Sequence, residues 1–311
     1  MSKLSHHQQR RISQKQQHKL LDGETAIVVT HLGFHYLLDV SGEVVIATAR
    51  KHLDAIACND KVVISRTGQD VVIEAIAPRN NVLSKWQGRR ERPIAANAEQ
   101  LLIVVAIEPE PQTTLIDRYL IAAERSGLQS ALVVNKIDLN PNALKDLLAP
   151  YQALNLPIFP ISLKHQIGLS ALTTWLSGKT TLICGQSGVG KSSLIQHYQP
   201  EVDIWTQAIS EINKLGKHTT TNMRRYPINS ETILIDTPGV RGYSVSHLTA
   251  KEILSGFPDV LAHQPCRFND CRHQNEPDCA ILSALEQGLI FQSRYQSLMQ
   301  MLSECEPKLK G

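Results

Sequence analysis

Two kinds of apolar pattern divide this chain into regions. Between residues 24 and 77, short runs of β-branched residues are separated by turn residues, a pattern typical of strands. From Glu99 onward, nearly continuous apolar runs alternate with helical stretches, which indicates a buried parallel sheet covered by helices. A chain of 311 residues is long enough for two or three domains of this size.

The first region predicts a small β-barrel. Five short strands in about fifty residues are typical of such barrels, and the oligonucleotide-binding (OB) fold is the commonest of them, although other five-stranded barrels have a similar pattern. The predicted strands are Thr25–Thr30, Tyr36–Val40, Val44–Ala49, Lys61–Ser65 and Val71–Ala77.

The second region predicts an α/β domain. Its expected strands are Leu101–Ile107, Ala131–Val134, Ile158–Ile161, Thr180–Cys184 and Thr232–Ile235, with helices near Leu115–Ser126 and Ala143–Leu154. Between the two regions, residues 79–95 are polar and basic. We interpret this connector either as a solvated linker or, alternatively, as a segment that contacts phosphates or forms a basic patch beside the barrel.

A phosphate-binding loop is predicted at Gly185–Ser192, which fits G-x-x-x-x-G-K-[ST] and lies between a strand and a helical stretch. Its glycines allow backbone N–H groups to turn toward phosphate oxygens, and the following helix adds its positive end. Lys191 is expected to reach the β- and γ-phosphates, and the Ser192 hydroxyl to ligate Mg²⁺. The other positions assigned to the nucleotide are Gly185, Gln186, Ser187, Gly188, Val189, Gly190 and Ser193. The alternative is a chance glycine-rich loop.

The choice of GTP over ATP depends on Asn135-Lys136-Ile137-Asp138, which ends a buried strand. Asp138 can accept two hydrogen bonds from guanine that adenine cannot donate. If ATP were bound, the carboxylate of Asp138 would be buried without a partner, which penalises ATP. Asn135 can contact the N7 side of the base, and the stem of Lys136 can lie along it. An N-K-x-D string alone occurs by chance, but beside a phosphate loop it predicts GTP.

Two further segments are predicted to respond to the γ-phosphate. Asp236 follows a strand and is expected to hold Mg²⁺, mostly through water, while the Gly239 N–H contacts the γ-phosphate. In the segment Gly216–Thr221, Thr220 is the preferred Mg²⁺ ligand and Thr221 the next candidate. A solvated loop is the alternative for this threonine-rich segment.

The order of the motifs is unusual, because N-K-x-D precedes the phosphate loop, whereas Ras-type switches have the reverse order. Val240 also stands where Ras-type enzymes have the glutamine that orients the attacking water. His218 is the candidate for that role, with an exposed histidine as the alternative, unless a partner positions the water. The predicted catalytic residues are His218, Lys191 and Thr220.

A zinc site is predicted near the end of the chain, where Cys266, Cys271, His273 and Cys279 form a Cys₃His set within fourteen residues. Such a set suits a structural tetrahedral Zn²⁺ site, and three reduced cysteines near a histidine are the alternative. A helical stretch, Ala280–Leu302, follows. Its expected packing positions are Ile281, Leu285, Leu289, Tyr295, Leu298 and Leu302.

Charge and hydropathy restrict the setting. The formal net charge is only +3, but residues 1–20 carry five Lys or Arg residues and no acid, which predicts a disordered basic arm that is either solvated or in contact with nucleic acid. No apolar run approaches the length of a membrane span, and no secretory signal is visible. We expect a cytoplasmic monomer without a membrane partner.

These motifs together resemble the ribosome small-subunit-dependent GTPase A (RsgA) family, which are bacterial circularly permuted GTPases. The matching segments are Ile94–Asn97, Asp117–Leu120, Asn135–Asp138, Gly185–Ser193, Gly216–Thr221 and Asp236–Gly239, with the zinc spacing. The resemblance implies binding to the small (30S) ribosomal subunit and its rRNA during late maturation, with GTP hydrolysis stimulated by that subunit and coupled to release. His218 matches the family's proposed catalytic histidine. Ser162-Leu163 stands where GTPases often have Ser-Ala, so Ser162 is assigned to the nucleotide.

The expected architecture is multidomain: a disordered arm (1–22), an OB-fold barrel (23–80), a circularly permuted α/β P-loop GTPase domain (81–250) and a zinc-binding domain with C-terminal helices (251–311). Three functions are weighed. The first is an RNA-dependent GTPase of ribosome assembly, the second a nucleotide-gated RNA-binding protein with negligible hydrolysis, and the third a GTPase that serves a protein or membrane complex.

Overall fold

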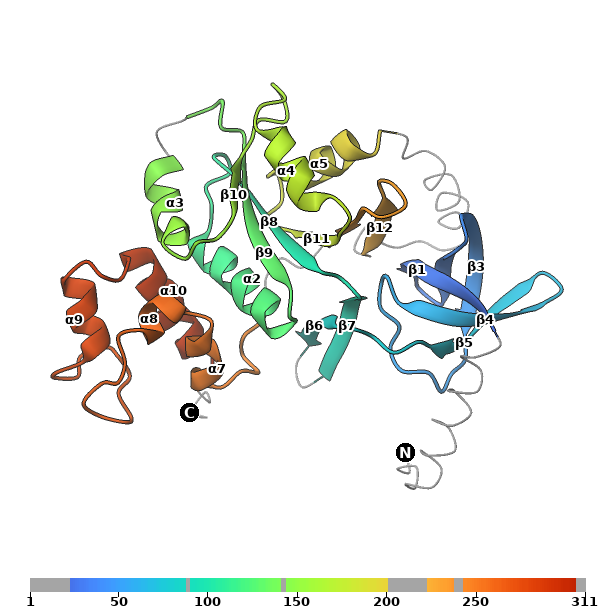
Figure 1. Cartoon of the computed structure of the whole chain (residues 1–311). Helices are drawn as coiled ribbons and strands as arrows, with labels where there is room; N and C mark the ends of the chain where they lie inside the picture. The colour runs from blue at the N-terminus through green and yellow to red at the C-terminus, as the bar shows by residue number, and fades with distance from the viewer. Residues whose placement is uncertain (1–22, 88–89, 141–143, 201–222, 238–242, 306–311) are drawn as a thin grey trace, which may run out of the picture.

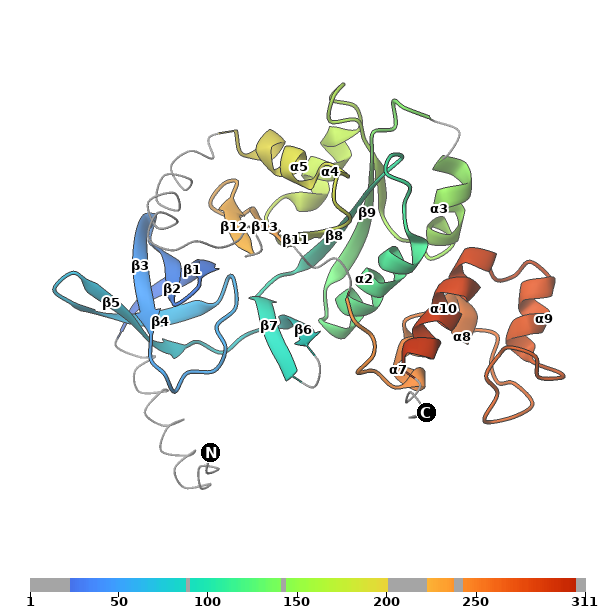
Figure 2. The ribbon, with the colours of Figure 1, turned by 180° about the vertical axis from the view of Figure 1, so that it is seen from behind.

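The computed structural model describes residues 23–87, 90–140, 144–200, 223–237 and 243–305. A barrel, a six-stranded sheet with helices and a helical C-terminal module follow one another along the chain (Figures 1 and 2). The predicted arm lies outside the described residues. Among the described helices, none has both the length and the apolar composition needed to cross a bilayer.

The N-terminal strands close into a barrel, as the short β-branched runs separated by turn residues predict. Its strands are β1 (Glu24–Leu32), β2 (His35–Val40), β3 (Glu43–Ala49), β4 (Lys61–Thr67) and β5 (Asp70–Ile76). Their order is β1-β2-β3-β5-β4, with only the β3–β5 pair parallel. Val28, Leu38 and Ile73 are among the side chains that fill its own core. The five-stranded barrel is therefore confirmed.

The basic connector is folded, so its interpretation as a solvated linker is wrong. Residues in it form an antiparallel hairpin of β6 (Val82–Gln87) and β7 (Arg90–Ala96). Arg79, just before the hairpin, donates from Nε and Nη2 to the carboxylate of Asp60, each at 2.7 Å. Cross-strand pairing, which the basic composition conceals, gives this segment its structure.

The second region forms the predicted open sheet, with one strand more than expected. The strands are β8 (Gln100–Ala106), β9 (Gln129–Asn135), β10 (Ile158–Pro160), β11 (Thr180–Cys184), β12 (Arg224–Pro227) and β13 (Ile233–Asp236), in the order β10-β9-β8-β11-β13-β12. All pair in parallel except β12, which is antiparallel to β13. The short, polar β12 has too weak a pattern to be predicted.

Helices cover both faces of this sheet. They are α2 (Thr113–Arg125), α3 (Leu144–Gln152), α4 (Leu169–Leu176) and α5 (Lys191–Tyr198). Ile116 of α2 and Leu148 of α3 share one buried cluster, whereas Leu172 of α4 and Leu194 of α5 belong to the cluster on the other face.

The C-terminal module contains α7 (Ala250–Ser255), α8 (Pro258–Leu261), α9 (Ala280–Glu286) and α10 (Gln292–Cys305). The continuous helical stretch predicted over Ala280–Leu302 is wrong, because Gly288 adopts a φ of +71° between α9 and α10. Left-handed backbone cannot continue a right-handed helix. Leu289, beside this break, is 59 % exposed and is not a core position, whereas Ile281 and Leu298 are buried as expected.

A buried ion-pair network joins the C-terminal module to the sheet domain. Arg294 of α10 is 1 % exposed, and its Nη1 lies 2.6 Å from Asp117 Oδ1 on α2. Its Nη2 lies 2.7 Å from Asp259 Oδ1 on α8, and its guanidinium stacks over Phe257. Two carboxylates offset the cost of burying this charge, so the pairing fixes α10 against α2.

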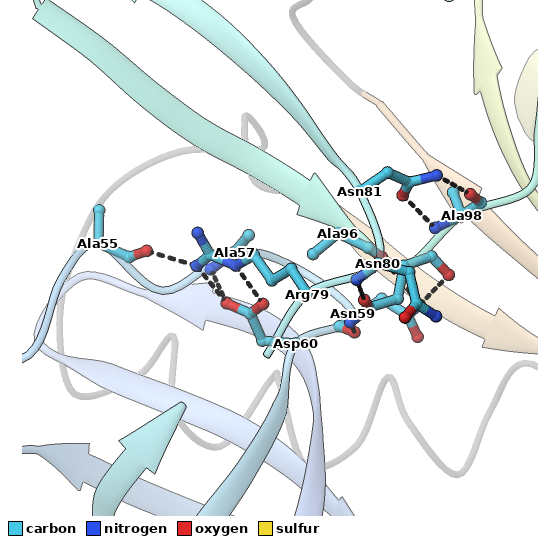
Figure 3. A network of polar contacts seen from close by, with 10 residues as sticks. Ala55, Ala57, Asn59, Asp60, Arg79, Asn80, Asn81, Ala96 and Ala98 are labelled. Atoms are coloured by element: carbon cyan, nitrogen blue, oxygen red, sulfur yellow. Dashed lines mark hydrogen bonds and ion pairs between the residues drawn. The ribbon is translucent and has the colours of Figure 1, made fainter. Parts of the chain in front are cut away.

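The barrel contacts the sheet domain through the buried Cys58, which bridges Ala95, and through hydrogen bonds that polar side chains and the backbone make. Asn59 Nδ2 donates to the carbonyls of Ala96 and Asn97 where β7 ends, and Figure 3 shows this network beside the Arg79–Asp60 pair. On the other side, Arg225 of β12 donates to Asn59 Oδ1 at 3.1 Å and to Asp39 Oδ2 at 3.2 Å.

Candidate nucleotide site and metal centre

The predicted nucleotide residues gather at one edge of the sheet. Asn135 ends β9, Gly185 follows β11, and Asp236 ends β13. The chain builds β8, β9 and β10 outward and then returns to place β11 on the opposite side of β8. Ligands of open α/β sheets bind at the carboxyl ends of strands near such a reversal.

The phosphate loop has the backbone that its glycines predict. Gly185 has a φ of +139°, and a Cβ there would lie 2.0 Å from the carbonyl oxygen of Val104. Gly190 has a φ of +101°, and a Cβ there would lie 2.3 Å from Asn135 Nδ2. Neither position therefore admits a side chain, and α5 begins directly afterwards at Lys191. The positive end of α5 faces the loop, which suits an anion.

Lys191 lies over this loop. Its Nζ donates to the carbonyl of Gly185 at 2.8 Å and to that of Gln186 at 2.6 Å. The ammonium group is thus held at the loop, where Ser187 and Val189 also lie and where a phosphate chain would be bound. Ser192 and Ser193 occupy the first turn of α5.

Asn135 joins the phosphate loop to the loop that follows β10. Its Nδ2 donates to the carbonyl of Val189 at 2.9 Å, and its Oδ1 accepts from the backbone N–H of Leu163 at 3.3 Å. The side chain is only 4 % exposed. Because both ends of its amide are used within the protein, Asn135 braces the site.

Lys136 is also fixed by backbone groups. Its Nζ donates to the carbonyl of Gly188 at 2.9 Å and to that of Glu108 at 2.6 Å, in the loop after β8. The lysine stem thus bridges three loops along this edge. Ile137 follows, with its backbone N–H 3.3 Å from the carbonyl of Ile161.

Asp138, which the sequence assigns to the base, is paired with Ser162. Ser162 Oγ donates to Asp138 Oδ1 at 2.6 Å, and Ser162 is fully buried. This hydrogen bond holds the pKa of Asp138 below its ordinary value, so the carboxylate is charged near neutral pH. An ionised acceptor at this edge of the sheet suits the adjacent N–H and amino donors of guanine.

His165 was missed by sequence reasoning. Its Nε2 lies 3.7 Å from Asp138 Oδ2, and its backbone N–H donates to Ser162 Oγ at 3.3 Å. The available signal was its place three residues after Ser162, in a loop at the carboxyl end of a parallel strand.

The environment of Asp236 suits a cation. Burial raises the pKa of its carboxyl group, and the nearby Lys191 charge opposes that rise. Its Oδ1 is buried and has no hydrogen-bond partner among the described residues. A buried carboxylate oxygen of this kind is costly unless a cation or water binds it, and carboxylates are natural Mg²⁺ ligands. His218, Thr220, Thr221, Gly239 and Val240 lie outside the described residues.

The zinc ligands come together as predicted. The ligand atoms of Cys266, Cys271, His273 and Cys279 all lie within 4.8 Å of one another. Two sulfurs bound tetrahedrally to one zinc ion would be separated by about 3.8 Å, and a sulfur and a nitrogen by about 3.6 Å. The observed separations are 3.9 Å for Cys266–Cys279, and 3.5 and 3.6 Å from those sulfurs to His273 Nδ1.

The surroundings of the cluster also fit zinc. The four residues can hold one zinc ion in a closed structural site, and none of their sulfurs is in a disulfide. The hydroxyl of Tyr295 on α10 donates to the carbonyl of His273 at 2.7 Å, which fixes the turn that presents the imidazole.

Comparisons with known proteins agree with this geometry. The family model described as RsgA GTPase matches residues 76–246. A Dichelobacter nodosus protein named small ribosomal subunit biogenesis GTPase RsgA is 47 % identical, covering 98 % of this chain and all of the relative. A Pseudomonas fluorescens protein of the same name is 39 % identical, covering 90 % of this chain and 86 % of its own.

Solved structures have the same fold. The crystal structure of YjeQ from Thermotoga maritima has a TM-score of 0.69 and 29 % identity, covering 91 % of this chain and 98 % of that one. The structure of YloQ, described as a circularly permuted GTPase, has a TM-score of 0.66 and 24 % identity, covering 92 % and 96 %. The permuted order inferred from the motifs is therefore confirmed at the level of the fold.

Proposed function

Since the chain belongs to the RsgA GTPase family, we propose that it binds the small ribosomal subunit, assists the late maturation of that subunit and hydrolyses GTP when bound to it. The observation that carries the proposal is the position of Asn135, whose amide joins the phosphate loop to the Ser162 loop beside Asp138. Base recognition and phosphate binding thus share one rigid edge. The protein is a GTPase, and its relatives of the same family are named for the small ribosomal subunit.

The residues of the site divide the work of binding and hydrolysis. Asp138 accepts hydrogen bonds from guanine, and Ser162 keeps that carboxylate in place. Lys191 neutralises charge on the β- and γ-phosphates. Ser192 and Asp236, with Thr220, would hold a Mg²⁺ ion, which would supply positive charge to the phosphates. We assign His218 to the positioning of the attacking water, because Val240 has no group that can do so.

The barrel supports RNA as the partner. His31 and Tyr36 stack at 4.6 Å between ring centroids, and Phe34, at the turn between β1 and β2, is 93 % exposed. Exposed aromatic rings and nearby cations are the means by which OB folds bind single-stranded nucleic acid. We therefore propose contact between this surface and rRNA, by a monomer acting in the cytoplasm.

The test is the rate of GTP hydrolysis with and without purified small ribosomal subunits. We expect a large increase with subunits, and none with ATP as substrate, because adenine lacks the donors that Asp138 requires. Binding without any turnover would instead indicate a nucleotide-gated RNA-binding protein. No effect of the subunits on either binding or turnover would contradict the proposal.

A further inference from the structure

The loop that follows β10 forms a closed turn beside Asp138. Ser162 and Ile167 exchange two backbone hydrogen bonds, at 3.1 and 3.0 Å, so residues 163–166 form a tight turn between them. Gly168 then has a φ of +75°, and a Cβ there would lie 2.1 Å from the carbonyl oxygen of Pro160. The turn is therefore seated closely against the end of β10, and the side chains that it carries have a defined place.

His165 lies on this turn, next to the carboxylate of Asp138. Its backbone N–H donates to Ser162 Oγ at 3.3 Å, and that hydroxyl donates to Asp138 Oδ1 at 2.6 Å. The ring of His165 faces the other oxygen, with Nε2 3.7 Å from Asp138 Oδ2. Two groups of a single turn thus face the two oxygens of one carboxylate. The side chain of Asp138 is still 20 % exposed, so an incoming base can reach it.

Two adjacent donors make a stricter demand on a carboxylate than one donor does. Guanine offers its ring N–H and its exocyclic amine side by side, so both oxygens of the carboxylate must lie in the plane of the base. The terminal torsion of an aspartate is soft, and rotation about it moves the oxygens out of that plane. The single hydrogen bond from Ser162 tolerates such rotation, because carboxylate oxygens accept donors from a broad range of directions. A contact at the second oxygen narrows the range.

We propose that His165 is a specificity-determining residue for guanine: its ring holds the second oxygen of Asp138, so that the carboxylate meets both guanine donors at once. An imidazole with a proton on Nε2 presents a donor to that oxygen whether or not the ring is charged. His165 acts through Asp138 and is therefore a positioning residue. The inference rests on the proposed function, in which Asp138 accepts hydrogen bonds from guanine.

The experiment measures the affinities of the full chain for GDP and for IDP, whose base lacks the exocyclic amine. Hypoxanthine offers one donor, so it tolerates a carboxylate that rotates. We expect His165→Ala to weaken GDP binding about tenfold and IDP binding by less than about twofold, so that the ratio of the two affinities falls. His165→Gln should retain most of the wild-type ratio, because its amide nitrogen can take the place of Nε2.

Lys164→Gln is the matched control for charge. The hydrogen bond from Ser162 lowers the pKa of Asp138, and the charges of His165 and Lys164 add to this effect. Lys164 is exposed and adjacent to His165 in the turn. Loss of its charge should change GDP and IDP affinity in the same direction and leave their ratio within about twofold of the wild type, because a nearby charge does not set the plane of the carboxylate.

A second pair of variants tests whether His165 acts through Asp138. Asp138→Ala should remove most of the preference for GDP over IDP, because the acceptor of both guanine donors is lost. Addition of His165→Ala to this variant should change the ratio no further, since the two side chains act as one unit. A further decrease of the ratio in the double variant would show that His165 acts on the base independently, which would overturn the inference.

The outcomes separate the inference from the assignment on which it rests. Retained IDP binding in His165→Ala shows that the variant is folded, so a selective loss of GDP affinity supports the inference. Equal losses for GDP and IDP, or no loss for either, would overturn it while a ratio that depends on Asp138 leaves the assignment intact. Absence of a preference for GDP in the wild type, or a preference that Asp138→Ala leaves unchanged, would contradict the assignment of Asp138 and the inference together.

Discussion

The C-terminal module and the barrel are attached to the sheet domain in different ways. Phe257 and Leu298 of the C-terminal module belong to the same buried cluster as Ile116 of α2. The barrel instead has a separate core that includes Val28 and Leu38. A shared apolar core makes the C-terminal module and the sheet one cooperative unit. The barrel adds Cys58 to that cluster, at its bridge with Ala95, but most of its apolar side chains fill its own core, so its junction should allow more movement.

The ion pair at the C-terminal junction is also more deeply buried than the ion pair at the barrel junction. The side chain of Arg294, between α10 and α2, is 1 % exposed, and that of its partner Asp117 is fully buried. The side chains of Arg225 and Asp39, at the barrel, are 12 % and 17 % exposed. The first pair cannot separate without leaving a charge in the core, but water can replace the second. The difference suggests that the barrel side, rather than the zinc side, adjusts when a partner binds.

The largest effect is expected from Arg294→Met. It leaves the carboxylate of Asp117 buried without its partner, which should lower the free energy of unfolding by about 3–5 kcal/mol. Urea unfolding monitored by circular dichroism would measure it. Arg267→Met is the control, because its partner Asp278 is 63 % exposed, and it should change stability by less than about 0.5 kcal/mol. Equal effects would show that the α2 junction is not the structural anchor.

Zinc removal should have a more local effect. Cys271→Ser removes one of four ligands, so zinc should be lost and the loop between Cys266 and Cys279 should become open to proteases. The shared core around Ile281 and Leu298 should persist, because apolar burial holds it. The zinc content and the pattern of limited proteolysis test this. Unfolding of the whole sheet domain would contradict the division between the loop and the core.

Mutations at the barrel junction should lower the free energy of unfolding less than Arg294→Met does. Asp39→Asn or Arg225→Met should cost about 1.5–3 kcal/mol, the range for a hydrogen bond to a charged group, because the pair is largely but not fully buried. Exchange of the charges, Arg225→Asp with Asp39→Arg, should recover part of that loss. Protease susceptibility between barrel and sheet, with a double-mutant cycle, measures the coupling. A cost as large as that of Arg294→Met would remove the contrast between the two junctions.

The smallest effect concerns Glu276 in the zinc loop. Its carboxylate accepts backbone N–H groups of Arg272, Gln274 and Asn275, which lowers its pKa to about 2. A lowered pKa in the folded state stabilises the loop above the ordinary value of 4.5, and this contribution is lost as the pH falls toward about 2. Glu276→Gln should therefore loosen the loop slightly at pH 7, measured as faster zinc release to a chelator. Unchanged release would exclude this contribution.

The sequence predicted local features of the fold well. The barrel strands, the buried strands and the phosphate loop were each predicted from a pattern of residues that are neighbours in the sequence. The prediction failed where a short or polar element depends on its neighbours. β12 is four residues long and forms only as the antiparallel partner of β13. The hairpin at residues 82–96 was not predicted, because its basic composition is typical of a linker. The helix break at Gly288 was not predicted, because apolar residues continue at helical spacing on both sides of it.

The candidate site was predicted to a similar extent. Five residues of the site could be identified from their residue type and their place at the end of a strand or in a glycine-rich loop. They are Asn135, Asp138, Ser162, Lys191 and Asp236. The contact of His165 with Asp138 and the orphaned Asp236 oxygen could not be predicted, since both depend on how loops pack.

The sequence by itself therefore determined the motif order, the GTPase family and the Cys₃His set that can hold zinc, because these depend on residue types at fixed local spacing. Only the tertiary structure decided which distant residues meet. Asp117 and Arg294 are 177 positions apart, and Trp86 meets His247 from another region of the chain. Such pairs arise from the packing of whole elements, and no local pattern records them. They determine which module is fixed to the sheet and which is left able to respond.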